Sequence, residues 1–206
     1  MRRTILTVLC VAAVQCGGTA SPTSPSPSDP DVSLTSLVAG GGYVVFFRHA
    51  ARDTSAISND ALLNADRIGE CMPGSELTPQ GQADSVAIGD AFRRRRIHVD
   101  RVHASPTCRT QQMATLAFGS HETTPGLAWP EIWAPEEAAA LSRVLPDLLS
   151  TEPARGSVTV LISHNGVLTP TRMGLDISLE QGEAAVFLPD GQRNFQFVGK
   201  IAKTDW

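Results

Sequence analysis

Hydrophobic and polar positions form two kinds of alternating segment from about residue 31 onward. Two apolar runs, GYVVFF (42–47) and SVTVLISH (157–164), lack polar alternation, which is typical of strands buried on both faces of a parallel sheet. A shorter run, DRVHASP (100–106), predicts another strand. The segment AAVFLPDGQRNFQFVGKI (184–201) predicts a closing hairpin that turns around Asp190 and Gly191.

Helical signals lie between these strands. In LTPQGQADSVAIGDAFRRRR (77–96), Thr78 can cap a helix, Pro79 suits its first position, and one face is expected to carry Ala83, Val86, Ala87 and Ala91. Ser105 and Pro106 repeat the signal and predict a helix through about Phe118. PEEAAALSRVLPDLLS (135–150) predicts a third helix, interrupted or kinked near Pro146. Strands that alternate with helices predict an α/β protein: a three-layer α/β/α sandwich with a mostly parallel central sheet.

The first 36 residues differ in composition from this pattern. Arg2 and Arg3 precede the apolar run ILTVLCVAAV, which has the length of a signal-peptide core and is too short to span a bilayer. It ends at Cys16 in AVQC, which resembles a bacterial lipobox, and a Gly-, Ser- and Pro-rich stretch follows. We therefore expect a signal peptide at 1–16 with lipidation on Cys16, a tether at 17–36 and one domain at 37–206. Cleavage to a soluble secreted or periplasmic form is the alternative.

Composition and charge narrow the function classes. The formal net charge of −4 over 206 residues gives no electrostatic reason to expect a nucleic-acid partner. The five histidines show no metal-ligand spacing with one another or with the cysteines, so no metal or other cofactor is implied. Cys71 and Cys108 remain in the expected domain, where they are either a disulfide of an oxidising compartment or two unrelated buried thiols.

Polar residues follow three of the predicted strands. They are Arg48 with His49, then Ser105 leading to Arg109, then Ser163 with His164 and Asn165. Because ligands of open α/β sheets bind beyond the carboxyl ends of the strands, we expect these groups to share one site. Guanidinium groups match phosphate oxygens, and Arg109 would lie in the first turn of a helix, where free N–H groups favour an anion.

Two histidines within a phosphate site suggest covalent catalysis. A neutral imidazole can attack phosphorus to form a phosphohistidine, which water then hydrolyses. A second imidazole, protonated, can hold the equatorial oxygens as charge develops on them.

Four blocks in this order, FFRHA, LTPQGQADSVAIGDAFRRRRI, VHASPTCRTQQMA and VLISHNG, resemble the histidine phosphatase (phosphoglycerate mutase-like) superfamily. The resemblance extends from about Gly42 to Ile201. It implies a phosphoglycerate mutase-like fold, with His49 as the nucleophile that becomes phosphorylated. Arg48, Arg109 and His164 match the other phosphate-binding residues.

The proton donor is where this sequence departs from the family. Many members carry a glutamate two residues after a leucine here, but Leu127 is followed by Trp129; Glu131 is the nearest acid and Glu136 the next. Another branch has aspartate directly after the second histidine, where Asn165 stands, and a carboxamide is not a general acid.

The sequence as a whole therefore predicts an exported phosphatase of the periplasm or cell envelope. Its expected substrate is a small phosphomonoester or an envelope glycan phosphate, and a lipid on Cys16 would tether it to a membrane. A phosphomutase is an alternative. A non-catalytic phosphate-binding envelope protein is another, and the missing acid supports it.

Overall fold

A computed structural model describes residues 33–169 and 173–206 of the protein. The strands are β1 (Val44–Arg48), β2 (Val99–Ala104), β3 (Glu122–Thr123), β4 (Val158–Ser163), β5 (Ala184–Pro189) and β6 (Phe195–Ile201). They form one sheet in the order β3-β2-β4-β1-β5-β6. The first four are mutually parallel, and β5 and β6 close the sheet as an antiparallel hairpin. Cys16 and the predicted signal peptide lie outside the described residues.

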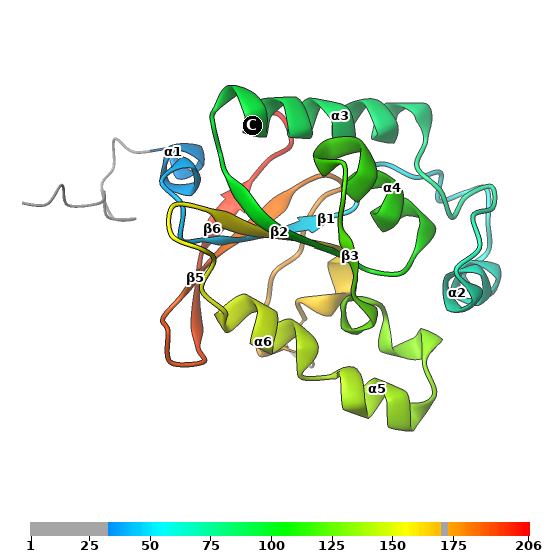
Figure 1. The fold of residues 1–206 in the computed structure, drawn as a ribbon. Coiled ribbons are helices and arrows are strands. Elements are labelled where there is room, and N and C mark those ends of the chain that lie inside the picture. The colour runs from blue at the N-terminus through cyan, green and yellow to red at the C-terminus, as the bar shows by residue number, and fades with distance from the viewer. Residues whose placement is uncertain (1–32, 170–172) are drawn as a thin grey trace, which may run out of the picture.

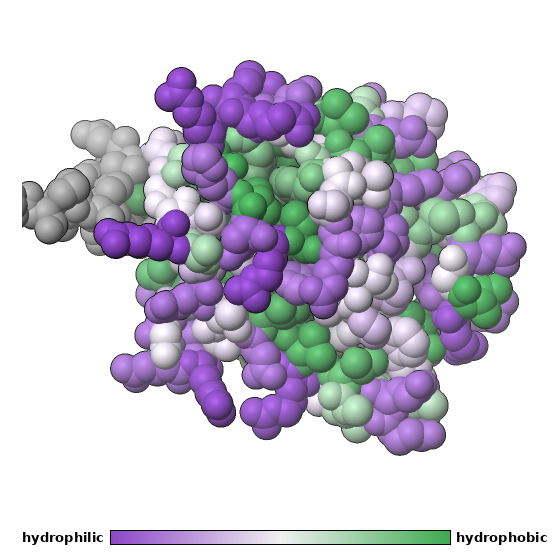
Figure 2. Space-filling view, viewed as in Figure 1, coloured by the Kyte–Doolittle hydropathy of each residue, from purple (hydrophilic) through white to green (hydrophobic). Residues whose placement is uncertain are grey.

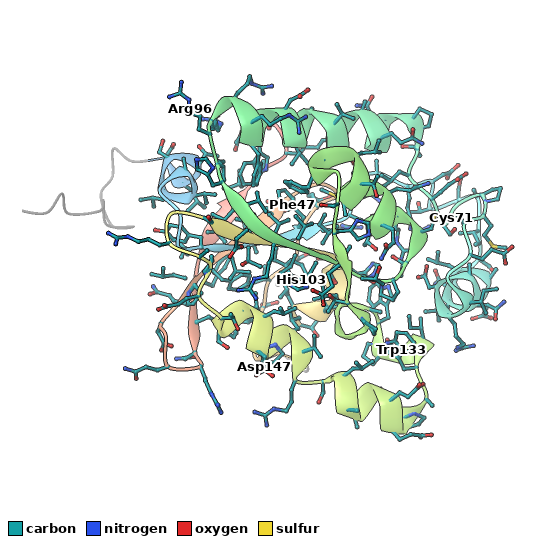
Figure 3. All side chains as sticks on the ribbon, viewed as in Figure 1. Phe47, Cys71, Arg96, His103, Trp133 and Asp147 are labelled. Carbon is teal, nitrogen blue, oxygen red and sulfur yellow. A yellow bond between two sulfur atoms is a disulfide. The ribbon has the colours of Figure 1, made fainter. Side chains whose placement is uncertain are left out.

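Helices cover both faces of the sheet (Figure 1). The helices α1 (Leu34–Ala39), α3 (Pro79–Arg94) and α4 (Cys108–Phe118) pack on one face, where Phe47 lies in the core (Figure 3). On the other face, α6 (Val144–Ser150) packs on Phe46 and Leu161. Because alternate residues of a strand point to opposite faces, the unbroken apolar runs of β1 and β4 supply both cores. The predicted α/β/α sandwich is confirmed.

The packing face of α3 is different from the predicted one. Thr78 caps the helix and Pro79 begins it, as expected, but Ala83, Val86 and Ala87 are exposed. The buried face instead carries the small residues Gly81, Ser85 and Gly89 with Ile88, Ala91 and Phe92. A Cβ atom on Gly89 would lie 2.1 Å from the carbonyl oxygen of Ala117 on α4, so the close approach of these two helices requires glycine.

Two other helix predictions need correction. Helix α4 begins at Cys108 with Thr107 at its N-cap, two residues after the expected Ser105 and Pro106 start. Residues 135–150 form two helices, α5 (Pro135–Leu141) and α6, so the predicted interruption is present, but it lies at Ser142 and Arg143, before Pro146. Pro146 is the third residue of α6, where its missing N–H breaks no intrahelical bond.

Several elements had no sequence prediction. Helix α1 begins at Leu34, inside the segment expected to be a tether, and buries Leu37 and Val38. Helix α2 (Asn59–Ile68) follows β1, and single 3-10 turns lie at Pro125–Leu127, Pro130–Ile132 and Asn165–Val167. Within the described residues, no helix has the length and hydrophobicity needed to cross a membrane.

A disulfide joins Cys71 to Cys108, with the two Cα atoms 5.2 Å apart. Cys71 follows α2 at the side of the molecule that carries this helix (Figure 3), whereas Cys108 is the first residue of α4. The bond therefore ties the segment after α2 to the helix that carries Arg109. A crosslink of this kind contributes typically about 2–4 kcal/mol by restricting the unfolded chain.

Candidate active site

The carboxyl ends of three neighbouring strands bring the predicted site residues together. Arg48 ends β1 and pairs in register with Ser163, which ends β4. The neighbour of β4 on its other side is β2, and the N–H of Ser105 at its end donates to Ile162 O. His49 and His164 follow these strand ends, and their ring centroids are 5.5 Å apart.

One pocket of about 560 Å³ contains the chemistry expected from the sequence. Arg48, His49, Arg109 and Glu131 line it, and Asn165 and Gly166 follow the end of β4. Three residues of α2, which are Asn59, Leu62 and Leu63, form a further wall, together with Arg52 and Trp129. His164 reaches the same site through a hydrogen bond to Arg109.

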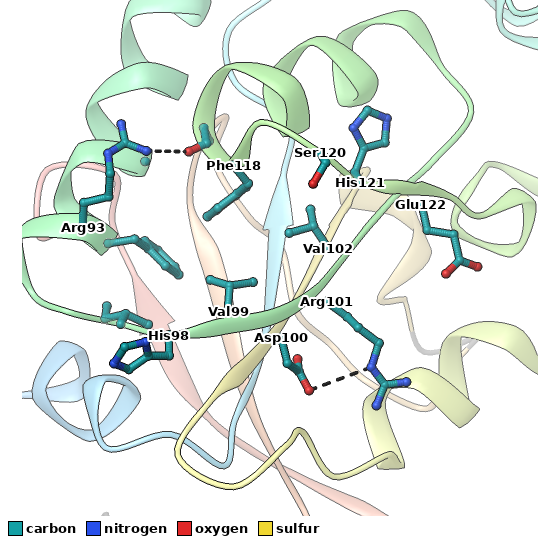
Figure 4. A pocket seen from close by; sticks show the side chains of 14 residues that line it. Arg93, His98, Val99, Asp100, Arg101, Val102, Phe118, Ser120, His121 and Glu122 are labelled. Atoms are coloured by element: carbon teal, nitrogen blue, oxygen red, sulfur yellow. Dashed lines mark hydrogen bonds and ion pairs between the residues drawn. The ribbon is translucent and has the colours of Figure 1, made fainter.

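A second pocket, of about 640 Å³, lies beside β2, between this strand and the helices α3 and α4 (Figure 4). Apolar side chains are visible here between hydrophilic ones in the space-filling view (Figure 2). Its lining includes His98 and His121, while His103 is buried in β2 against Thr124. These three histidines match no motif, and the strand ends that carry the predicted residues lead to the other pocket. We therefore assign the chemistry to the pocket around His49.

His49 is held as a neutral imidazole with one nitrogen available. Its side chain is 4% exposed, and Nδ1 lies 2.8 Å from the carbonyl oxygen of Ala50. Because a carbonyl can only accept, Nδ1 carries the hydrogen and Nε2 keeps its lone pair. Burial lowers the pKa of His49 well below its usual value, and the charges of Arg109, Arg48 and Arg52 lower it further. This is the state that a nucleophile needs.

The hydrogen bonds of His164 define a neutral imidazole. The ring is fully buried, with Nδ1 3.2 Å from Arg109 Nη2 and Nε2 2.9 Å from Ser105 Oγ. Since a guanidinium can only donate, Nδ1 accepts and Nε2–H donates to the serine oxygen. Burial and the nearby Arg109 lower the pKa of His164 well below its usual value. His164 is thus a neutral residue that contacts Arg109, and its protonation as charge develops on a phosphate stays a prediction.

Arg109 is fixed by a carboxylate that the sequence did not reveal. Asp66 of α2 accepts hydrogen bonds from Nη1 at 2.8 Å and from Nη2 at 2.9 Å. Both side chains are 1% exposed. The sequence contains no motif for Asp66, because its importance depends on α2 packing over the site. Only the amphipathic pattern of residues 59–68 could have indicated the helix.

Arg48 is positioned through Asn165. Its Nη1 donates to Leu179 O at 2.7 Å, and the neighbouring Leu179 N–H donates to Asn165 Oδ1 at 2.7 Å. Nδ2 of Asn165 donates to Ser178 Oγ at 3.3 Å. Asn165 therefore holds the segment whose carbonyl group orients the first arginine. This is a structural use for a residue at a position where the sequence resemblance led us to consider an acid.

Arg52 is a third guanidinium group of the pocket, and the sequence analysis missed it. Its Nη1 donates to Gly74 O at 3.0 Å, and its side chain lines the pocket with Arg48 and Arg109. Burial lowers the pKa of Arg52, and the positive charge of Arg109 adds to this effect. The close spacing of three guanidinium groups with one buried carboxylate leaves an excess of positive charge, which favours a dianion.

Trp129 stacks on His164, with ring centroids 5.1 Å apart and planes inclined by 27°. A Cβ atom on Gly166 would lie 2.3 Å from Trp129 Cζ3, so this indole also requires glycine directly after Asn165. The residue found in place of the expected acid is therefore a packing residue that covers the second histidine.

The two candidate acids have different positions. Glu131 lines the pocket, and its exposed position lets the side chain turn toward a bound molecule. The backbone carbonyl of Glu131 accepts from Arg67 Nη2 at 3.3 Å, which ties the turn to α2. Glu136 is exposed in the first turn of α5. Of the two, Glu131 is the one placed to reach a leaving group.

The buried neutral histidines predict acid-sensitive stability. Their pKa values are lowered in the folded protein, whereas an unfolded histidine titrates near about 6.5. The unfolded chain therefore binds more protons below that pH, and folding stability is complete above it. Below that pH, we expect each of the two histidines to lower the free energy of unfolding by about 1.4 kcal/mol per pH unit, until the pH reaches its lowered pKa in the folded protein.

Urea unfolding followed by circular dichroism between pH 7.5 and 5.5 measures this loss. His49→Gln should lower this slope by up to about 1.4 kcal/mol per pH unit, and the rest of the slope belongs to His164, His103 and His121, whose pKa values burial also lowers. The same change at exposed His98 is the control. Equal slopes for the wild-type protein and His49→Gln would contradict a buried neutral His49.

The fold is phosphoglycerate mutase-like, an α/β class that includes the histidine phosphatases. The protein histidine phosphatase SixA, solved with tungstate, superposes with a TM-score of 0.50 at 18% identity, covering 79% of this chain and 97% of that one. A mutant phosphoserine phosphatase from Entamoeba histolytica, solved with phosphoserine, gives 0.51 at 13% identity, covering 79% and 98%. No protein-family model and no curated protein matches the sequence.

Proposed function

We propose that this protein is a phosphatase that hydrolyses phosphomonoesters through a phosphohistidine on His49. The observation that carries the proposal is the pocket itself. It places a neutral imidazole with a free Nε2 among the guanidinium groups of Arg48, Arg52 and Arg109. Such a site attracts a phosphate dianion and presents a nucleophile to it.

The reaction would run in two displacements. In the first, the lone pair of His49 Nε2 forms an N–P bond while the ester P–O bond breaks, and the leaving oxygen takes the electron pair and a proton. In the second, water attacks phosphorus and the N–P bond breaks, so that the electron pair returns to Nε2. The proton of the water passes to the conjugate base of the acid, or to solvent. Arg48, Arg52 and Arg109 would stabilise the charge on the equatorial oxygens in both steps.

Glu131 is the proposed proton donor to the leaving oxygen. It lines the pocket from the turn at Pro130–Ile132, across from the strand ends that carry His49. The role requires hydrogen-bond reach of the leaving oxygen, directly or through one water.

The two similar structures support a phosphatase over other uses of this fold. One of those proteins is a protein histidine phosphatase bound to tungstate, and the other is a phosphoserine phosphatase bound to phosphoserine. Each is a phosphatase with a tetrahedral oxyanion or a phosphomonoester present. This chain has the same fold and places its own arginines and histidines at one sheet edge.

We further propose that the protein acts outside the cytoplasm, in the periplasm or cell envelope. The predicted signal peptide at 1–16 and the Ser/Pro-rich tether after it support export. We propose lipidation on Cys16 as part of the same export signal. The Cys71–Cys108 disulfide is consistent with an oxidising compartment. Substrates would then be small phosphomonoesters or envelope glycan phosphates.

A non-catalytic phosphate-binding protein is the second candidate. Two observations favour it: Asn165 is used for a hydrogen bond to Leu179 and Trp129 for packing on His164, at the positions where the sequence resemblance led us to expect an acid. A non-catalytic protein of this kind would bind inorganic phosphate but would release none from phosphate esters.

Phosphate release from a panel of phosphomonoesters separates the two candidates. The panel should include p-nitrophenyl phosphate, phosphoserine and a sugar phosphate, with His49→Ala as the control. We expect release from at least one ester by the wild-type protein and none above background by His49→Ala. Phosphate binding without any release would establish the non-catalytic alternative.

A further inference from the structure

Asp66 forms the closest ion pair of the pocket wall, and it comes from α2 rather than from a strand end. Its two carboxylate oxygens take one hydrogen each from Nη1 and Nη2 of Arg109. Both groups are almost completely buried. A bidentate pair of this kind fixes the plane of a guanidinium as well as its position.

The hydrogen bonds of Arg109 limit what it offers to a ligand. A guanidinium has five N–H groups. Asp66 takes two, and His164 Nδ1 accepts the second hydrogen of Nη2. This leaves one hydrogen on Nη1 and the Nε–H, a buried donor with no partner in the part of the chain that the structure describes. A buried donor without a partner is costly unless a ligand satisfies it.

We propose that Asp66 is a positioning residue for phosphate binding. It holds the plane of Arg109 against His164, so that the remaining N–H groups keep fixed directions and one of them can donate to a phosphate oxygen. The inference rests on the proposed function, since it assigns the ligand of the same site. The alternative is that Asp66 competes with phosphate, because its carboxylate accepts hydrogen bonds from Arg109 that the phosphate would otherwise accept.

Calorimetric titration with inorganic phosphate separates the two roles without requiring turnover. We expect Asp66→Asn to weaken phosphate binding by about 10²-fold, because the amide keeps one acceptor oxygen but replaces the other with a donor, which a guanidinium cannot accept, so that Arg109 is no longer held in plane. Asp66→Glu, which keeps the carboxylate, should recover much of the affinity. Asp60→Asn is the matched control, since Asp60 is exposed in the first turn of the same helix. This variant should bind phosphate like the wild-type protein.

A second pair of variants guards against a folding defect. Arg109→Met removes the guanidinium, and Asp66→Leu with Arg109→Met replaces the whole buried pair by apolar groups, an exchange that proteins tolerate. If Asp66 acts through Arg109, the double variant should bind phosphate no more weakly than Arg109→Met, because an unpaired Asp66 carboxylate can only repel the anion. A further loss in the double variant would mean that Asp66 acts on the site by another route, and the inference would be wrong.

Tighter phosphate binding by Asp66→Asn would establish competition and overturn the positioning role. Unchanged binding would overturn it as well. If the wild-type protein binds phosphate and Asp66→Asn weakens it, but no ester is hydrolysed, the inference stands while the proposed catalytic function fails. An absence of phosphate binding by the wild-type protein would remove both.

Discussion

His49→Ala is expected to lower phosphatase turnover by about 10³-fold or more, because no covalent intermediate can form without the attacking nitrogen. The wild-type protein, incubated with a radiolabelled phosphoester and denatured in alkaline detergent, should carry label on the protein. The N–P bond of a phosphohistidine survives base and is cleaved by acid, so acid should remove this label. The variant should carry none.

The matched control for this experiment is His98→Ala, a histidine that lines the other pocket and is exposed. It should label like the wild-type protein. Label that persists in His49→Ala would assign the nucleophile to another residue. Acid-stable label would mean an oxygen ester in place of a phosphohistidine.

Glu131→Gln is expected to slow hydrolysis of alkyl phosphates by roughly 10²- to 10⁴-fold, the usual contribution of a positioned general acid. An alkoxide leaves poorly without a proton, and glutamine cannot supply one. Aryl phosphates such as p-nitrophenyl phosphate should be affected much less, because the phenolate leaves unaided. The ratio of kcat/KM between the two substrate types therefore measures proton donation directly.

Glu136→Gln provides the comparison for this prediction, since Glu136 lies on the exposed first turn of α5. We expect it to keep the wild-type ratio. Equal losses on both substrate types in Glu131→Gln would indicate a damaged pocket instead of a missing acid. If Glu131→Gln loses nothing, the donor is Glu136 or solvent.

The electrostatics of the pocket are compatible with a buried histidine as the proposed nucleophile. Burial and then the charges of Arg109, Arg48 and Arg52 lower the pKa of His49, and in the proposed reaction these arginines would also attract the phosphate dianion. The negative charge of Asp66 offsets part of the positive charge at Arg109 and so reduces the repulsion among the three guanidinium groups. The same arginines would thus prepare the nucleophile and bind its target.

The sequence by itself determined the sheet and the centre of the site. The apolar runs of β1 and β4 contain no alternating polar positions, and this pattern alone predicts strands that are buried on both faces of a parallel sheet. Arg48, His49 and His164 follow these strands directly, and strand direction alone brings them to one edge. The Cys71–Cys108 disulfide was also among the predictions, since two cysteines remained in the expected domain.

Only the tertiary structure decided which residues complete the site and in what state. Asp66 and Arg52 belong to segments without a strand or motif signal, and their contacts join residues 43 and 22 positions apart. The neutral form of His164 depends on Arg109 and Ser105, which no local pattern relates to it. The packing face of α3 was misjudged for a similar reason. Close backbone contacts select small residues, Gly89 against Ala117 of α4 and Gly81 against Ala51 after β1, whereas the sequence pattern ranks positions by hydrophobicity alone.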